Sequence, residues 1–334
     1  MTDRATSIAA FLSTAGWGAA DRRLLAGDAS FRKYYRLSGP QGPAVLMDAP
    51  PPMENVGPFL AIARHLHDLG YSAPRILAED RAAGLLLIED FGDATFTRLL
   101  ASGTDEASLY ALAVDLLIDL HKQPRAAAID LPPYDEERLF AEAALLTDWY
   151  LPAIGAAVPS AVREDYRARW SRAFQIFAAT PPTLVLRDYH VDNLMRLPGR
   201  SGVAACGLLD FQDAVLGPPA YDLVSLLEDA RRDVSPGVAA AMTARYLAAF
   251  PALNRERFLA GYAVLGAQRN AKIVGIFTRL MVRDKKPHYL VHIPRVWRLL
   301  EGDLKHPALA EVAEWFDRHV PRQIRRVPDV QAVS

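Results

Sequence analysis

The sequence predicts an α+β fold in two lobes, a small lobe built on an antiparallel sheet and a larger, mainly helical lobe. The chain has 334 residues, which is enough for about two domains. Short β-prone runs separated by Gly- and Pro-rich turns occupy its first part. Longer segments with helical spacing of apolar residues follow, interrupted by two short strands around a polar loop. We expect the lobes to be residues 1–89 and 90–334.

The expected elements of the small lobe are a short N-terminal amphipathic helix, a hairpin, a second helix and two more strands. The hairpin covers 31–47, because the Gly- and Pro-rich segment 39–43 is a strong turn signal. The second helix begins at Pro58 and stops at Gly70. The further strands are expected at 75–78 and 85–88.

The large lobe is expected to be a series of helices around one polar loop. Thr104 is a suitable N-cap for the first helix, which has acidic residues in its first turn. The short strands of this lobe are expected at 184–186 and 203–209. Its helices are expected at 104–121, 135–150, 160–179, 219–230, 236–250, 253–283 and 305–320.

The composition excludes several classes of protein. Hydrophobic residues make up 51% and charged residues 23%, which is typical of a folded globular chain and not of a disordered one. With 38 basic and 39 acidic residues, the net charge of −1 gives no overall attraction to nucleic acid or an anionic membrane. No apolar run is long enough to span a membrane. We therefore expect a cytoplasmic monomer without nucleic-acid or membrane partners.

The single cysteine, Cys206, excludes an internal disulfide and a multi-thiolate zinc site. It stands in an apolar run, so we expect a buried strand residue and not a reactive thiol.

Three oxygen-bearing side chains around the polar loop point to phosphoryl transfer. Asp188 is followed five residues later by Asn193, and Asp210 ends an apolar strand 22 residues after Asp188. Transfer from ATP needs a carboxylate that accepts the proton of the attacking hydroxyl. It also needs an amide and a second carboxylate to hold Mg²⁺, which prefers oxygen ligands. The alternative is a polar turn in which each side chain bonds only to local backbone.

This pattern resembles the aminoglycoside phosphotransferase and protein-kinase-like superfamily, with its H-x-D-x-x-x-x-N loop and D-F-x strand end. The resemblance implies a kinase-like fold, ATP as co-substrate, Asp188 as catalytic base, and Asn193 and Asp210 as Mg²⁺ ligands. Leu186 stands where the family usually has His. That position is structural, so the role of Asp188 is unaffected.

The resemblance also places the nucleotide. Backbone groups of Glu89 and Phe91 would meet the adenine edge at the hinge between the lobes, with Leu209 among the apolar residues around the base. Asp90-Phe91-Gly92 spells D-F-G but lies far upstream of the catalytic loop, so it is not the metal-binding motif.

The part of the small lobe that is expected to bind the ATP phosphates departs from the family pattern. The turn before the hairpin has a single glycine, so Ser30 and backbone amides would contact the phosphates. The family's phosphate-binding lysine belongs about at Met47. The following helix has no obvious mid-helix glutamate to pair with it, since Glu54 is at the helix start, so the lysine–glutamate pair is absent from the sequence. Arg32, or its neighbour Lys33, is the expected source of the missing positive charge.

Longer segments resemble a bacterial subgroup of sugar kinases that phosphorylate the anomeric hydroxyl of N-acetylmuramate and N-acetylglucosamine in cell-wall recycling. The resemblance covers roughly residues 24–298 and implies that an amino sugar is the acceptor. Eight basic residues and one acid lie between 269 and 298, and part of them would form a stripe along a helix. Such a basic stripe suits the negatively charged lactyl carboxylate of N-acetylmuramate. Its alternative is a solvated basic face. The segments with the resemblance are 27–32, 47–51, 186–190 and 266–279. The acceptor-binding candidates are Arg269, Lys272, Arg279, Tyr189, His190, Asp192 and Asp213.

Two other functions remain open at the level of sequence. One is a kinase of another small alcohol, of choline or antibiotic type; choline would need an aromatic cage, for which Trp149, Tyr150 and Trp297 are available. The other is a pseudokinase that binds nucleotide as a regulatory module. Asp222, at a helix start, and His121 are expected to have structural and not catalytic roles.

Overall fold

The computed structural model describes residues 4–26 and 31–329. It has two compact units. The first contains the chain up to Leu116 together with Val191–Ala214. The second contains Leu117–His190 and the chain from Val215 onward. The predicted lobes, 1–89 and 90–334, were assigned from the roles expected of each part, and they stay a prediction. The two compact units divide the chain differently, because Val191–Ala214, from the polar-loop region, belongs to the first unit.

The first unit is built on a five-stranded antiparallel sheet with the order β1-β2-β3-β5-β4. The predicted hairpin is confirmed, with Gly39 facing Gly42 at the turn and Lys33 facing Asp48 at the far end. Gly42 has a φ of +94°, which favours glycine at this turn. The strands are β1 (Asp21–Ala26), β2 (Lys33–Gly39), β3 (Gly42–Asp48), β4 (Ile76–Asp80) and β5 (Leu85–Glu89).

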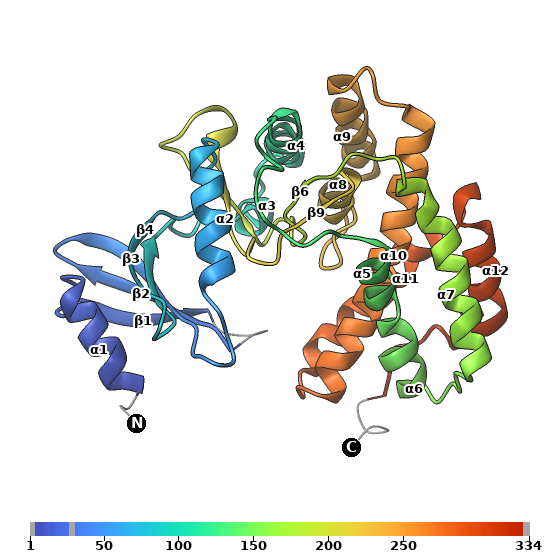
Figure 1. Ribbon diagram of the computed structural model, residues 1–334, viewed down its shortest axis with the longest axis horizontal. Coiled ribbons are helices and arrows are strands. Elements are labelled where there is room, and N and C mark those ends of the chain that lie inside the picture. Colours follow the sequence, from blue (N-terminus) through green and yellow to red (C-terminus); the bar gives the residue numbers. More distant parts are fainter. Residues whose placement is uncertain (1–3, 27–30, 330–334) are drawn as a thin grey trace. The chain divides into compact units, whose positions relative to one another are not determined.

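Helices cover both faces of this sheet (Figure 1). The N-terminal helix α1 (Arg4–Thr14) packs Ile8 and Leu12 against alternate strand residues such as Leu46 and Leu87. The opposite face meets α2 (Gly57–Asp68), which corresponds to the predicted second helix. Because side chains alternate across a strand, Met47 points to the face opposite Leu46. Two further helices begin in this unit, α3 (Phe96–Ala101) and α4 (Glu106–Lys122).

A small hairpin completes the first unit. Strands β7 (Leu194–Arg196) and β8 (Cys206–Leu208) pair antiparallel. The amide of Leu208 donates to the carbonyl of Ser72 at 2.8 Å, which joins the hairpin to the segment before β4. The strand predicted at 203–209 was too long, because a 3-10 turn occupies Gly202–Ala205. The expected burial of Cys206 is confirmed.

The second unit is mainly helical, with one short ladder between β6 (Thr183–Val185) and β9 (Val215–Gly217). The helix at Ile293–Asp303 was not predicted from the sequence. No helix of the described residues is long and apolar enough to cross a membrane. The helices are α5 (Glu136–Ala143), α6 (Leu151–Ala153), α7 (Ser160–Phe174), α8 (Ala220–Leu227), α9 (Pro236–Ala249), α10 (Arg255–Val282), α11 (Ile293–Asp303) and α12 (Ala310–His319).

The long helix α10 packs closely against the segment after α5. A Cβ at Gly275 would lie 2.3 Å from the carbonyl carbon of Leu145, so only glycine permits this backbone approach. The helix predicted at 135–150 ends early here. It ends at Ala143, and a π-helical turn, Leu146–Tyr150, follows. The close approach brings α5 and α10 together, and both contribute polar side chains described below.

Candidate active site

The loop that contains Asp188 is held by a buried carboxylate. Asp222, in the first turn of α8, accepts the amide of Leu186 at 2.6 Å and that of Arg187 at 2.9 Å. Ser225 on the same helix donates to the carbonyl of Arg187 at 3.2 Å. Arg187 has a φ of +69°, an uncommon conformation for a residue other than glycine. The loop is therefore fixed directly before Asp188, as expected of Asp222.

Asp222 is fully buried, and burial raises the pKa of its carboxyl to about 7, although the two amide donors oppose the shift. A carboxyl whose pKa is higher in the folded state stabilises the fold below its unfolded pKa. That contribution is lost as the pH rises from about 4 to about 7.

We predict that Asp222→Asn removes this dependence. Between pH 5 and pH 8, the wild type should lose about 1–3 kcal/mol more unfolding free energy than the variant. Urea unfolding at the two pH values measures the difference. Parallel losses in both proteins would contradict the predicted titration.

Asn193 and Asp210 lie at neighbouring ends of the β7–β8 hairpin in the first unit. Asn193 directly precedes β7, Asp210 closely follows β8, and the amide of Leu209 donates to the carbonyl of Asn193 at 2.9 Å. Asp210 is exposed, with a φ of +57°. Gln212 donates from Nε2 to Oδ1 of Asp210 at 2.8 Å. The hairpin register therefore brings together the two side chains that the sequence predicts as metal ligands.

The donor atoms at this end of the hairpin fit Mg²⁺. Asn193 and Asp210 offer amide and carboxylate oxygens, and Oε1 of Gln212 is buried with no hydrogen-bond partner in the described chain. Within residues 4–26 and 31–329, no group of three or more His, Cys, Asp or Glu could hold a metal. Mg²⁺ commonly uses only one or two carboxylates and completes its shell with water and phosphate oxygens.

A cation occupies the region where the family's lysine is missing. Met47 is buried in β3, directly opposite Tyr34 on β2. Arg32 forms an ion pair with Glu54, 2.8 Å between Nε and Oε2, and a hydrogen bond with Tyr34. Burial and the negative charge of Asp210 raise the pKa of Tyr34 to about 12. Arg32 and Glu54 thus form a cation–carboxylate pair near Asp210. Ser30 and its turn lie outside the described residues.

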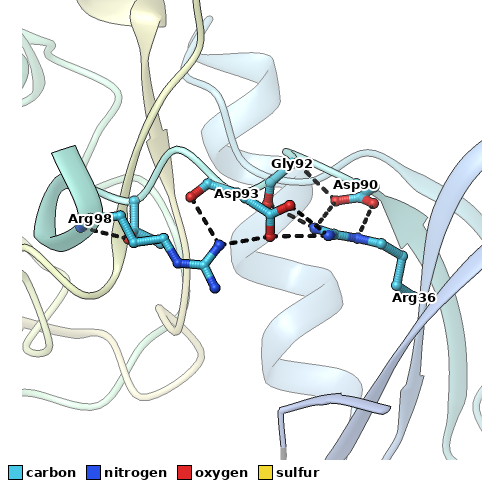
Figure 2. A network of polar contacts seen from close by, with 6 residues as sticks. Arg36, Asp90, Gly92, Asp93 and Arg98 are labelled. Carbon is cyan, nitrogen blue, oxygen red and sulfur yellow. Dashed lines mark hydrogen bonds and ion pairs between the residues drawn. The ribbon is translucent and has the colours of Figure 1, made fainter. Parts of the chain in front are cut away.

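The segment after β5, predicted to meet adenine, is held by ion pairs. Arg36 on β2 contacts Asp90 and Asp93, with 2.6 Å from Nε to Asp90 and 2.9 Å from Nη1 to Asp93 (Figure 2). It also donates to the carbonyl of Gly92 at 2.9 Å. The hydrogen bond from Arg36 lowers the pKa of the Asp93 carboxyl. Asp90 of the D-F-G sequence therefore forms an ion pair with Arg36, which is a structural contact.

The two residues predicted at the adenine edge have different surroundings. The carboxylate of Glu89 forms an ion pair with Arg200 at 2.6 Å, and its amide donates to the carbonyl of Arg75 at 2.9 Å. The ring of Phe91 lies against Gly207, where a Cβ would come within 3.0 Å of it. Leu209, the third predicted nucleotide contact, is half-buried.

The predicted acceptor residues near the catalytic loop belong to both units. Tyr189 and His190 are buried in the second unit, where Nε2 of His190 is 3.5 Å from Nη1 of Arg231. In the first unit, Asp192 accepts a hydrogen bond from Thr97, and Asp213 is exposed. These four assignments stay predictions.

The three cations predicted for the acceptor carboxylate are confirmed to share one helix, α10, but they differ in surroundings. Arg269 is buried and donates to the carbonyl of Glu228 at 3.1 Å. Lys272 pairs with Glu142 at 3.0 Å. Arg279 is half-buried, and its Nε has no partner in the described chain. Burial, followed by the charge of Arg283, lowers the pKa of Arg279. Arg279 is thus the cation of the three that most needs an anion.

Glu142 is the main residue that sequence reasoning missed. It lies 45 residues before Arg187 in a helix without a recognisable motif, yet it contacts both Arg187 and Lys272. Glu142 is one of three glutamates in the sequence of this amphipathic helix, and nothing in the sequence signals such contacts. His121, by contrast, is a packed residue as predicted: its Nδ1 is 2.7 Å from the hydroxyl of Tyr246, and burial lowers its pKa to about 4.

Comparison with known proteins places the chain in a family. A model of the phosphotransferase enzyme family matches residues 21–259. The chain belongs to this family. It is 41% identical to a protein of Caulobacter vibrioides named N-acetylmuramate/N-acetylglucosamine kinase, over 97% of this chain and 99% of that protein. A protein of the same name from Pseudomonas aeruginosa is 38% identical, over 90% and 89% of the two chains.

Solved structures agree with a phosphotransferase fold. The chain resembles a choline/ethanolamine kinase family protein from Mesorhizobium loti with a TM-score of 0.62 and 14% identity, covering 94% of this chain and 99% of that one. A choline kinase from Streptococcus pneumoniae gives a TM-score of 0.62 and 14% identity over 90% and 99%. These similarities confirm the kinase-like α+β fold.

The aromatic side chains considered for a choline cage in this phosphotransferase mostly have other roles. Tyr150 is fully buried and donates to the carbonyl of Arg326 at 2.8 Å. Trp297 is buried against Tyr150, with ring centroids 5.4 Å apart, and the guanidinium of Arg325 covers its ring. Both belong to the packing of the C-terminal segment, which leaves only Trp149 of the three for a cage.

Proposed function

We propose that this phosphotransferase moves the γ-phosphoryl group of ATP to the anomeric C1 hydroxyl of N-acetylmuramate and N-acetylglucosamine, a step of peptidoglycan recycling. The observation that carries the proposal is the 41% identity, over nearly the whole of both chains, to a kinase named for these two sugars. The segments predicted from sequence to resemble such kinases include the catalytic loop and α10. Similarity to choline kinases is confined to the fold, at 14% identity.

In the proposed reaction, the C1 oxygen forms a bond to the γ-phosphorus as the bond to the bridging oxygen of ADP breaks. The carboxylate of Asp188 accepts the hydroxyl proton. Asp222 and Ser225 support this role by fixing the backbone next to Asp188. Positioning and charge stabilisation provide most of the rate enhancement in such transfers.

Asn193 and Asp210 are the proposed ligands of Mg²⁺, which neutralises phosphate charge when it is bound. Arg32 is the proposed phosphate-binding cation, with Glu54 and Tyr34 keeping its guanidinium in place. Arg279 is the best candidate for the lactyl carboxylate, because its Nε lacks a partner within the described residues.

Arg32→Ala tests the replacement of the lysine. If Arg32 binds the phosphates, we expect the KM for ATP to rise about tenfold or more, since a charge-assisted contact contributes about 1.5–3 kcal/mol. The sugar KM should be nearly unchanged. Lys33→Ala is the matched control, because it makes the same truncation at the next residue, the first of β2. Unchanged ATP affinity and turnover in Arg32→Ala would exclude this role.

Phosphorus NMR of the purified protein with Mg-ATP and either amino sugar tests the function. The expected product signal is a phosphate coupled to the anomeric proton, absent without the sugar. Phosphate on another hydroxyl would exclude C1 as the acceptor. Transfer to choline or an antibiotic alone would favour the other kinase hypothesis. Nucleotide binding without transfer to any of a broad panel of alcohols would favour the regulatory module.

A further inference from the structure

A largely buried carboxylate in the second unit contacts two cations. Glu142, at the end of α5, forms ion pairs with Arg187 and with Lys272, the latter 3.0 Å from Nζ to Oε2. The hydroxyl of Tyr134 donates to the same carboxylate, and Gln268 donates from Nε2 at 3.3 Å. The side chains of Glu142, Arg187 and Lys272 are only 13%, 17% and 12% exposed. We call these five residues the Glu142 cluster.

The charge of Glu142 is well stabilised in this position. Burial would raise the pKa of its carboxyl, but Lys272 and Arg187 outweigh burial and hold the pKa below its ordinary value. Two cations and one carboxylate also leave the cluster with one excess positive charge. Such a buried pair is costly to break, because removal of one partner leaves an uncompensated charge in the interior.

The cluster completes the support of the catalytic loop. Asp222 fixes the backbone of Leu186 and Arg187 from one element, α8. Glu142 fixes the side chain of Arg187 from another, α5. Arg187 needs both, because its φ of +69° is an uncommon conformation that persists only where the surroundings determine it. Asp188 is the next residue, so any change in Arg187 shifts the proposed base directly.

Lys272, a residue of α10, connects that helix to Glu142. Its Nζ donates to the hydroxyl of Tyr221 at 3.3 Å, in addition to its ion pair with Glu142. The ring of Tyr134 in turn packs edge-on against Tyr221, with centroids 5.0 Å apart. The contacts of Lys272 thus belong to the same network, and its acceptor-binding role stays a prediction.

We propose that Glu142 is a positioning residue for the phosphoryl transfer, acting through Arg187 to fix the conformation in which Asp188 is presented. This inference rests on the proposed function, because it assigns Asp188 as the base. It adds a residue outside the catalytic loop and outside its sequence motif. Glu142 itself is not expected to contact the sugar or ATP.

The first test is the isosteric change Glu142→Gln, with Glu136→Gln as the matched control. Glu136 lies on the same helix but is exposed. We expect kcat to fall about 10- to 100-fold in Glu142→Gln, since small misplacements of a catalytic group have effects of this size. The KM for ATP should be nearly unchanged, and Glu136→Gln should behave as the wild type.

A double-mutant cycle with Arg187→Met separates positioning from a general structural role. If Glu142 acts through Arg187, adding Glu142→Gln to Arg187→Met causes little further loss of kcat. Losses that multiply would overturn the proposal, as would full kcat in Glu142→Gln.

Hydrogen exchange provides a readout that does not depend on the substrate. The amides of Leu186 and Arg187 should exchange at least about tenfold faster in Glu142→Gln than in Glu136→Gln, because a loosened loop releases them from Asp222. Unchanged exchange would overturn the proposal. If wild type phosphorylates neither sugar, the proposed function fails, whereas exchange still decides the role of Glu142. If Glu142→Gln does not fold, the exchange is measured with Lys272→Met added, which removes one of the two cations left without their carboxylate.

Discussion

Replacement of Asp188 by Asn should reduce kcat about 10²- to 10⁴-fold, the usual contribution of a general base. Asparagine has the same shape as aspartate, but its amide cannot accept the proton of the sugar hydroxyl. Asp222 accepts the backbone amides of Leu186 and Arg187, and these contacts are kept in the variant, so the loop should keep its conformation. Steady-state kinetics with saturating Mg-ATP and N-acetylglucosamine measure the loss.

The KM for ATP and the midpoint of thermal unfolding are the controls for this variant. Both should stay close to the wild-type values, because Asp188 is half-buried and is not expected to bind the nucleotide. Asp192→Asn, the same change on a nearby residue of the same segment, should lose much less activity. Turnover near the wild-type rate in Asp188→Asn would mean that another group accepts the proton or that none is needed.

Much of the fold could be predicted because local signals and tertiary structure agree. The 31–47 hairpin has a strong turn sequence between β-prone runs, and α10 has apolar residues at helical spacing over nearly its whole length. The pairing of β7 with β8 could not be predicted in the same way. Strands of three residues are too short for periodicity to be visible, and they are stabilised by non-local contacts such as that between Leu208 and Ser72.

In the candidate site, too, residues with a local sequence signal could be predicted, and residues that depend on distant contacts could not. Asp188, Asn193 and Asp210 could be predicted because their spacing in the sequence reflects one loop and one strand end. Arg32 was predicted only as a possible substitute for the missing lysine, and its pairing with Glu54 became clear only in the structure. Glu142 was not found, since its importance comes from its contacts with residues far away in the chain. Sequence spacing therefore identifies residues that react together more readily than residues that hold them.

Replacement of Asp210 by Asn should have the second large effect on activity. Asparagine keeps an oxygen that can accept from Gln212 and tolerates the left-handed conformation at a φ of +57° better than most residues. The hairpin should therefore remain folded, while the negative charge that attracts Mg²⁺ is lost. We expect kcat at a low Mg²⁺ concentration to fall about 10²-fold or more, since charge stabilisation is usually the largest contribution to such transfers.

The dependence on Mg²⁺ distinguishes a lost ligand from a damaged fold. In Asp210→Asn the Mg²⁺ concentration for half-maximal activity should rise, and excess Mg²⁺ should recover part of the loss, because the remaining oxygen ligands still favour this ion. Asp213→Asn, three residues on and exposed, is the matched control and should leave the Mg²⁺ dependence unchanged. A loss in Asp210→Asn that is equal at all Mg²⁺ concentrations would contradict the ligand role. The same result would point instead to the charge that Asp210 exerts on Tyr34 beside Arg32.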